Sequence, residues 1–287
     1  MSSAVDPAVT ADGAWLAPAK LNLMLRVVGR RDDGYHLLQT VFQFIDRCDR
    51  LYFEPRDDGR IVRRRGAPGV PPERDLIVRA AEALRTRCGS RHGVTVDLDK
   101  VLPMGGGLGG GSSNAATTLV ALNRLWGLGL DVDELAGIGL SLGADVPVFV
   151  RGRAAWAEGV GERLSPVELA EPWYLVLTPP ESVATAAVFG DPALTRDSAP
   201  VTMADFVGGD QANDCLDVVL TRYPVVAEAF RWLEAAAGHA RLTGTGCCVF
   251  AVFESEPAAR VVAETAPPAY GAFVARGCNR SPLFSPG

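Results

Sequence analysis

The segment from residue 103 to 114 restricts the fold more than any other part of the chain. Six of the seven residues from Gly105 to Gly111 are glycine, and glycine lets backbone N–H groups approach an anion without interference from a Cβ atom. We expect this loop to enter a helix N-terminus, with Ser112 and Ser113 as candidate caps. The unpaired N–H groups and partial positive charge of that terminus would form a phosphate cradle. The helix is predicted from apolar residues at spacings of 4, 3 and 4: Ala115, Leu119, Leu122 and Trp126.

Other loop types fit the same segment less well. The Walker pattern requires Gly-Lys-Ser/Thr, and no lysine lies here. The dinucleotide pattern fits Gly105, Gly107 and Gly110, but that loop follows a strand directly and needs an acidic residue ending a second strand. Here Pro103 lies between the preceding strand and the loop, and the acidic residues Asp131 and Asp133 fall in an expected turn between helices. The interpretation as a flexible linker is also disfavoured, because this loop leads directly into a helix beside two serines.

Lysine is scarce in this chain, since 26 of its 28 basic residues are arginine and only Lys20 and Lys100 are lysine. Lysine offers a compact ammonium that arginine cannot replace. Residues 20–28 alternate as a strand, which predicts that Lys20, Asn22 and Met24 share the side facing away from the core. Lys20 and Asn22 are therefore expected to lie side by side. The residues expected on the core side are Leu21, Leu23, Leu25 and Val27.

The remaining segments predict mixed secondary structure. Residues 29–34 are expected to form a turn, 57–72 a surface loop, and 156–166 a crossing between domains. Because the strands and helices do not alternate regularly, the predicted fold class is α+β rather than doubly wound. Strands are expected at 41–45, 50–54, 94–98, 146–150 and 173–177 and in the glycine-punctuated segment from Leu242, and helices at 76–87, 133–142 and 225–236.

Composition excludes several classes of protein. The formal net charge of −6 does not favour binding to nucleic acid, and no apolar run is long enough to predict a membrane span. The first residues lack the basic and apolar parts of a signal peptide, so a cytoplasmic location is expected. Three scattered histidines and six cysteines without a CxxC pair predict reduced thiols rather than disulfides or a zinc site. The cysteines are Cys48, Cys88, Cys215, Cys247, Cys248 and Cys278.

The glycine-rich segment resembles the phosphate loop of the GHMP small-molecule kinases. Five more segments are similar to the members of that family that act on a cytidine-diphosphate-linked sugar alcohol: PAKLNL from Pro18, DGYHLLQT from Asp33, LGADVPVF from Leu142, EGVGE from Glu158 and LTGTG from Leu242. The resemblance covers about residues 16–284. It implies an ATP-binding domain like ribosomal protein S5 domain 2 over residues 11–164. A ferredoxin-like domain that contributes to substrate binding would occupy residues 165–287, with the site in the cleft between the domains.

The resemblance also implies an activity, the transfer of phosphate from ATP to the 2-hydroxyl of the methylerythritol part of a CDP-linked substrate. Asp145 would be the general base, a role typically worth about 10²–10⁴-fold in rate. Lys20 would stabilise developing negative charge. Mg²⁺ is implied as a second cofactor. The resemblance places the hydroxyl of Ser112 or Ser113 near the phosphates or the metal, and the sequence does not identify the other Mg²⁺ ligands. The implied ATP contacts are Asp75, Leu76, Pro103, Met104, Gly105, Gly106, Gly107, Leu108, Gly109, Gly110, Gly111, Ser112 and Ser113.

The other end of the substrate is assigned in the same way. Tyr35 and Phe189 match stacking rings for cytosine, and stacking on a base is worth about 1–3 kcal/mol. His36 matches the residue that hydrogen-bonds the cytosine edge. Asn22, Lys100 and Thr185 match positions near the diphosphate and erythritol groups, where a basic residue would pair with phosphate.

Two departures from the family pattern bear on this assignment. Asp75 stands where the family usually has asparagine near the adenine, and an aspartate lacks the amide donors. Cys247 and Cys248 stand where serine or alanine is common, and small buried residues are favoured over a redox pair. A GHMP kinase for homoserine, mevalonate or a sugar is one alternative, and a nucleotide-binding protein without turnover is another. The expected partner is a small molecule, with no nucleic acid or membrane, on a monomer or weak homodimer.

Overall fold

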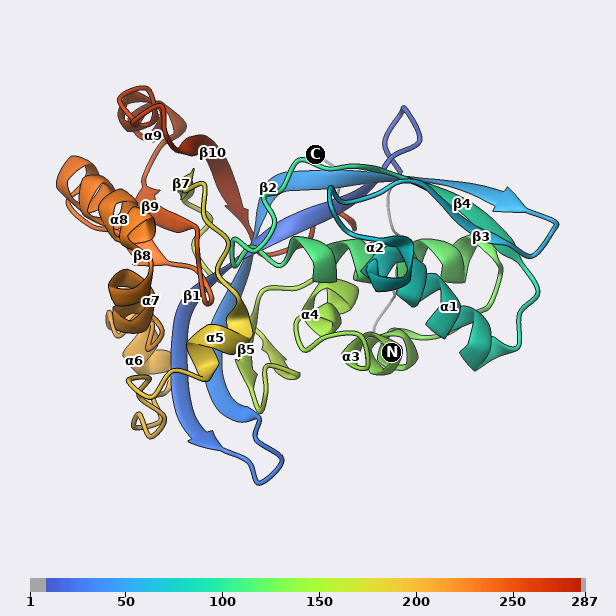
Figure 1. Cartoon of the computed structure of the whole chain (residues 1–287), viewed down its shortest axis with the longest axis horizontal. Helices are drawn as coiled ribbons and strands as arrows, with labels where there is room; N and C mark the ends of the chain where they lie inside the picture. The colour runs from blue at the N-terminus through green and yellow to red at the C-terminus, as the bar shows by residue number, and fades with distance from the viewer. Residues whose placement is uncertain (1–8, 285–287) are drawn as a thin grey trace.

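The computed structural model describes residues 9–284, which form an α+β structure around a ten-stranded sheet (Figure 1). The main path of the sheet has the order β3-β4-β2-β10-β7-β9-β8, while β1 and β5 pair with β2, and β6 pairs with β5. The strands are β1 Trp15–Arg30, β2 His36–Arg56, β3 Ile61–Arg65, β4 Gly93–Asp99, β5 Ala155–Glu158, β6 Arg163–Pro166, β7 Trp173–Thr178, β8 Arg241–Leu242, β9 Val249–Phe253 and β10 Gly271–Cys278.

Helices cover the sheet in two groups, as Figure 1 shows. The group α1 to α4 packs beside β1, β2 and β3 in the N-terminal part, and α8 and α9 pack on β7, β9 and β10 in the C-terminal part. The bounds are α1 Leu76–Cys88, α2 Gly110–Leu125, α3 Val132–Leu140, α4 Val146–Arg151, α5 Thr185–Phe189, α6 Met203–Val207, α7 Leu216–Arg222, α8 Pro224–Ala237 and α9 Glu256–Ala263, with a 3₁₀ turn at Pro72–Arg74.

The antiparallel pair β1 and β2 joins the two parts of the molecule. Their register runs from Trp15 opposite Leu51 to Arg30 opposite His36, and the two strands extend from one helix group to the other (Figure 1). One hydrophobic core lies between this pair and helices α1 to α4. The other joins β1 to β7, β9 and α8, and it contains the predicted core residues Leu21, Leu23, Leu25 and Val27.

One side-chain prediction on β1 is wrong. Met24 is predicted to face away from the core, but it is fully buried in the core that joins β1 to β7, β9 and α8. The register of β1 against β2 shifts between Asn22 and Met24, so strict alternation does not continue past Asn22. Both faces of this part of the strand are covered, which alternation alone does not reveal.

Two other predictions are corrected. Residues 146–150 are helix α4, not a strand, because a short apolar run fits either structure; Pro147 lies in its first turn, and Gly152 ends it in the left-handed conformation. The expected loop 57–72 contains β3, which pairs in parallel with β4. Its three arginines carry no apolar signal, and it is held by ion pairs of Arg64 and Arg65 with Asp97.

The predicted helices at 76–87, 133–142 and 225–236 are confirmed as α1, α3 and α8, with ends shifted by up to two residues. Residues 41–45 and 50–54 belong to one strand, β2, and the expected crossing 156–166 is largely the β5–β6 hairpin. The predicted α+β class is confirmed. The division at residues 164 and 165 falls inside β6 and stays a prediction, and residue 285 onward lies outside the described residues.

Candidate active site

A cavity of about 570 Å³ lies between two glycine segments, residues 105–111 and 244–246, and the elements β1 and α5. This volume is typical of a small-molecule site. Most of the predicted site residues line it: Lys20, Asn22, Asp75, Leu76, Lys100, Pro103, Met104, the glycine segment through Ser112, Asp145, Thr185 and Phe189. Three predicted residues do not line it, namely Tyr35, His36 and Ser113.

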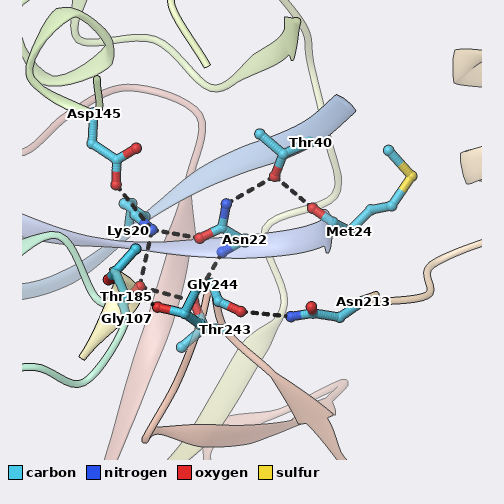
Figure 2. A network of polar contacts seen from close by, with 11 residues as sticks. Lys20, Asn22, Met24, Thr40, Gly107, Asp145, Thr185, Asn213, Thr243 and Gly244 are labelled. Atoms are coloured by element: carbon cyan, nitrogen blue, oxygen red, sulfur yellow. Dashed lines mark hydrogen bonds and ion pairs between the residues drawn. The ribbon is translucent and has the colours of Figure 1, made fainter. Parts of the chain in front are cut away.

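Lys20 lies at the centre of the polar network (Figure 2). It is only 3% exposed, and its ammonium donates to Asn22 Oδ1 and, over 2.9 Å, to the carbonyl of Gly107. The same Nζ lies 3.3 Å from Asp145 Oδ2. A buried ammonium with three oxygen neighbours is held in one place, which is what stabilisation of developing charge requires.

Asp145 immediately precedes α4, but its side chain does not cap that helix. The carboxylate instead turns towards Lys20 (Figure 2) and remains 34% exposed. A structural capping role is therefore excluded by the geometry. The carboxylate lines the cavity, where it can accept a proton from a bound hydroxyl group.

Asn22 is fixed by hydrogen bonds on both of its sides. Its Nδ2 donates to Thr40 Oγ1 over 2.8 Å, and its backbone N–H donates to Thr243 Oγ1 over 3.0 Å. Thr40 in turn donates to the carbonyl of Met24. Because Nδ2 is used in this way, the oxygen of Asn22 must face Lys20, and the predicted Lys20–Asn22 neighbourhood is observed.

The two glycine segments are joined by hydrogen bonds between their backbones. The N–H groups of Cys247 and Cys248 donate to the carbonyls of Gly105 and Gly106, over 3.2 and 3.1 Å. Gly107 has φ +76°, and a Cβ there would lie 2.1 Å from the carbonyl oxygen of Thr243. Both cysteines are buried, so their contribution at this point is backbone hydrogen bonding and packing.

Helix α2 begins inside the glycine segment. Its N-cap is Gly109, with φ +71°, so the predicted serine caps are wrong. Ser112 lines the cavity, whereas Ser113 is fully buried and its hydroxyl has no partner among residues 9–284. The first N–H groups of α2 are free of intrahelical bonds and belong to residues that line the cavity, so they are able to bind an anion.

Lys100 is held at the start of α2 by a buried carboxylate. Its Nζ donates to Asp49 Oδ2 over 2.6 Å and would lie 3.1 Å from a Cβ on Gly110. Asp49 also accepts from Asn114 Nδ2 and from the N–H groups of residues 101 and 102. Burial lowers the pKa of Lys100, and the Asp49 carboxylate offsets part of that effect. Lys100 thus lies beside the glycine segment, at the predicted phosphate site.

Asp75 has a local structural role as the N-cap of α1, where Oδ1 accepts from the N–H of Ile77 over 2.9 Å. Its Oδ2 accepts from Arg63 on β3. Both side chains are largely buried, and Asp75 and Leu76 line the cavity. An arginine therefore compensates the buried carboxylate at the position where the resemblance predicts an asparagine.

The predicted cytosine contacts are only partly assembled. His36 stacks on Phe189 with ring centroids 5.0 Å apart and an interplanar angle of 23°, whereas Tyr35 is 63% exposed and makes no ring contact within the described part of the chain. Thr185 Oγ1 lies 3.1 Å from Thr245 Oγ1. Burial lowers the pKa of His36 below 6.5, and the neighbouring Arg196 and Arg30 cations lower it further.

The sequence did not indicate several residues that belong to the site. Thr40 and Thr243 orient Asn22, and Asn213 donates to the carbonyl of Gly244 over 2.9 Å (Figure 2). Asn213 also donates to the carbonyl of Leu242 over 2.9 Å. Asp49 positions Lys100, and Arg196 contacts His36. All of these contacts join residues far apart in the chain, so no local pattern indicates them.

Comparisons with known proteins identify the family of this chain. The model "GHMP kinases N terminal domain" matches residues 75–153, and "GHMP kinases C terminal" matches residues 201–271. A 4-diphosphocytidyl-2-C-methyl-D-erythritol kinase from Methylococcus capsulatus is 57% identical over 268 residues, covering 93% of this chain and 92% of that relative. The chain belongs to the 4-diphosphocytidyl-2-C-methyl-D-erythritol kinase family. As a GHMP kinase of this family, it is a small-molecule phosphotransferase that uses ATP.

Further relatives and solved structures extend the comparison. A kinase of the same name from Pseudomonas aeruginosa is 56% identical over 267 residues, covering 93% of this chain and 94% of that relative. A crystal structure of a 4-(cytidine 5'-diphospho)-2C-methyl-D-erythritol kinase has a TM-score of 0.80 at 34% identity, with 92% of this chain and 98% of that one covered. A mevalonate kinase at 14% identity, with a TM-score of 0.69 and 93% and 99% covered, shares the fold.

These findings confirm the predicted two-domain GHMP kinase fold. Among residues 9–284, no helix is long and apolar enough to cross a membrane.

Proposed function

We propose that the chain transfers the γ-phosphoryl group of ATP to the 2-hydroxyl of 4-diphosphocytidyl-2-C-methyl-D-erythritol. The products would be the 2-phosphate and ADP, in the non-mevalonate route to isoprenoids. The observation that carries the proposal is the contact between Lys20 and Asp145 at the glycine segment, 3.3 Å from Nζ to Oδ2. The relatives of the same name at 56–57% identity support the choice of substrate.

In the proposed step, Asp145 accepts the proton of the 2-hydroxyl as its oxygen attacks the γ-phosphorus. A bond forms between that oxygen and phosphorus, and the bond from phosphorus to the bridging oxygen of ADP breaks. Lys20 stabilises the negative charge that develops on the transferred group, since its ammonium is held beside the carboxylate by Asn22 and Gly107. Phosphoryl transfer depends mainly on such positioning and charge stabilisation.

The phosphates of ATP would lie along the glycine segment and the start of α2. Backbone N–H groups there and the ammonium of Lys100 supply the donors. No group of three or more acidic, histidine or cysteine side chains able to hold a metal occurs in the described chain. This fits Mg²⁺, which keeps several waters and takes few protein ligands. Ser112 and Asp145 are the oxygen donors at the cavity that would hold it beside the phosphates, where it would offset phosphate charge.

The cytidine end would occupy the space beside α5. Phe189 and the exposed ring of Tyr35 are proposed to enclose the cytosine by stacking, with His36 hydrogen-bonding its edge. Asn22 and Thr185, which line the same cavity, would contact the erythritol and diphosphate groups. We further propose a cytoplasmic enzyme that is a monomer or weak homodimer, with the division between ATP-binding and substrate-binding domains near residues 164 and 165.

The direct test is ADP release from Mg-ATP with the cytidyl substrate, beside homoserine, mevalonate and galactose as control acceptors. Release with the cytidyl substrate alone, together with a new phosphomonoester signal in phosphorus NMR, supports the proposal. Release with another acceptor would keep the Lys20–Asp145 chemistry and refute the cytidine contacts. ATP binding without release on any acceptor would refute catalysis.

A further inference from the structure

We propose that Arg196 is a positioning residue that holds His36 as the tautomer with its proton on Nδ1. His36 then presents an N–H donor to the base, and this donor selects cytosine over uracil. The inference rests on the proposed function in one respect, that a pyrimidine base binds beside His36. The tautomer itself follows from contacts within the protein.

The decisive contact is a hydrogen bond between two side chains. Arg196 Nε lies 3.2 Å from His36 Nε2. Every nitrogen of a guanidinium is a donor and none is an acceptor, so Nε2 must supply a lone pair. A neutral imidazole with a lone pair on Nε2 carries its proton on Nδ1, because the partner of one ring nitrogen decides the state of the other.

Arg196 is itself held rigidly. Nη1 donates to the carbonyl of Leu194 over 2.9 Å, and Nη2 donates to those of Phe189 and Asp191 over 2.9 and 2.6 Å. Phe189 is the last residue of α5, and its ring stacks on His36. One guanidinium therefore fixes the tautomer of His36 and the end of the helix that carries its stacking partner.

Two further observations agree with a neutral ring and a free donor. Burial and the cations of Arg196 and Arg30 lower the pKa of His36, which favours the neutral ring. Within residues 9–284, His36 Nδ1 has no hydrogen-bond partner. A polar N–H that is fixed and unpaired is available to a ligand.

The tautomer has a consequence for base recognition. Position N3 of cytosine is an acceptor, whereas N3 of uracil carries a hydrogen and is a donor. Where this N–H of His36 faces N3 of the base, as we propose, it pairs with cytosine and opposes uracil, while the other tautomer would present a lone pair and reverse the preference. Leaving a donor unpaired against another donor is costly in a partly buried site.

The tautomer is measurable by ¹⁵N NMR of the histidine ring nitrogens at pH 7.5 in the whole protein. His239 is an internal reference, because its Nε2 accepts from the N–H of Val252 over 2.9 Å, which requires the same tautomer. We expect His36 to show a protonated Nδ1, and Arg196→Met to move the proton largely to Nε2, the form that free histidine favours. Arg222→Gln is the matched control, since Arg222 bonds Ala187 in α5 and Asp191 but not His36.

Binding of CDP and UDP to the same three proteins tests the selectivity. We expect the wild type and Arg222→Gln to prefer CDP by at least tenfold, and Arg196→Met to lose most of that preference with its affinity for ATP unchanged. A proton on Nε2 in the wild type, or an unchanged preference in Arg196→Met, overturns the inference. A wild type that binds neither nucleotide overturns the selectivity together with the proposed substrate, whereas the NMR result still decides the tautomer.

Discussion

The ion pair between Asp49 and Lys100 offers a sharp test of how the phosphate site is held. Asp49 is 0% exposed and the Lys100 side chain is 13% exposed. In Asp49→Asn, the retained oxygen can still accept from the N–H groups of Val101 and Leu102. The new amide, however, points donors at the Lys100 ammonium and at Asn114, both of which are donors themselves.

Removing one member of a buried ion pair costs about 3–5 kcal/mol, because a charge remains buried without its partner. Since two of the four hydrogen bonds survive in Asp49→Asn, we expect the lower end, about 3 kcal/mol. At about 2–4 °C per kcal/mol for a chain of this size, the Tm should fall by about 6–12 °C. The KM for ATP should rise, since Lys100 is no longer held beside the glycine segment.

The assay is thermal unfolding followed by steady-state kinetics below the lower Tm. Asp99→Asn is the control, because Asp99 precedes Lys100 and its side chain makes, among residues 9–284, only an exposed contact with Arg65, 4.0 Å apart. Such pairs contribute about 0–1 kcal/mol. Lys100→Met combined with Asp49→Asn should recover part of the lost stability, because no unpaired ammonium remains. An Asp49→Asn protein with wild-type Tm and wild-type KM for ATP would refute this reasoning.

Two further predictions concern the glycine segments and pH. Gly107→Ala should fold less stably and lose most affinity for ATP in calorimetric titrations, because its Cβ would lie 2.1 Å from the Thr243 carbonyl oxygen at φ +76°. The control Gly137→Ala, where a Cβ has open space, should bind ATP normally. Equal binding of ATP by both variants would contradict the prediction. The pKa of His36 is lowered in the folded protein, so the unfolded chain binds the proton more readily. The contribution of His36 to stability is therefore complete above pH 6.5 and is lost as the pH falls through the folded pKa. The KM for the cytidyl substrate should rise over the same acid range while that for ATP does not, and a flat KM for the substrate would contradict the assignment.

Local patterns predicted those parts of the fold that depend on local interactions. Helix α1 was predicted at residues 76–87, and α2 from a glycine segment followed by apolar residues at helical spacing. The Lys20–Asn22 neighbourhood also follows from alternation along one strand. These features are set by residues within a few positions of each other, so a single sequence contains the information.

The failures have a common physical origin in long-range contacts. Residues 146–150 are apolar throughout, and only their packing against α2 and α3 decides between helix and strand. β3 carries three arginines whose role depends on carboxylates such as Asp97 and Asp75, more than ten positions away. Asp49 and Arg196 act on residues 51 and 160 positions away, and composition does not single them out.

The central claim is that Asp145 removes the proton from the substrate hydroxyl beside Lys20. The most direct measurement is single-turnover phosphoryl transfer by Asp145→Asn with the cytidyl substrate, together with its Kd for ATP. Asparagine keeps the shape of the side chain but cannot accept the proton, and base catalysis contributes about 10²–10⁴-fold. We predict a rate at least about 100-fold lower with nearly unchanged ATP binding. A near-normal rate in this variant would contradict the mechanism.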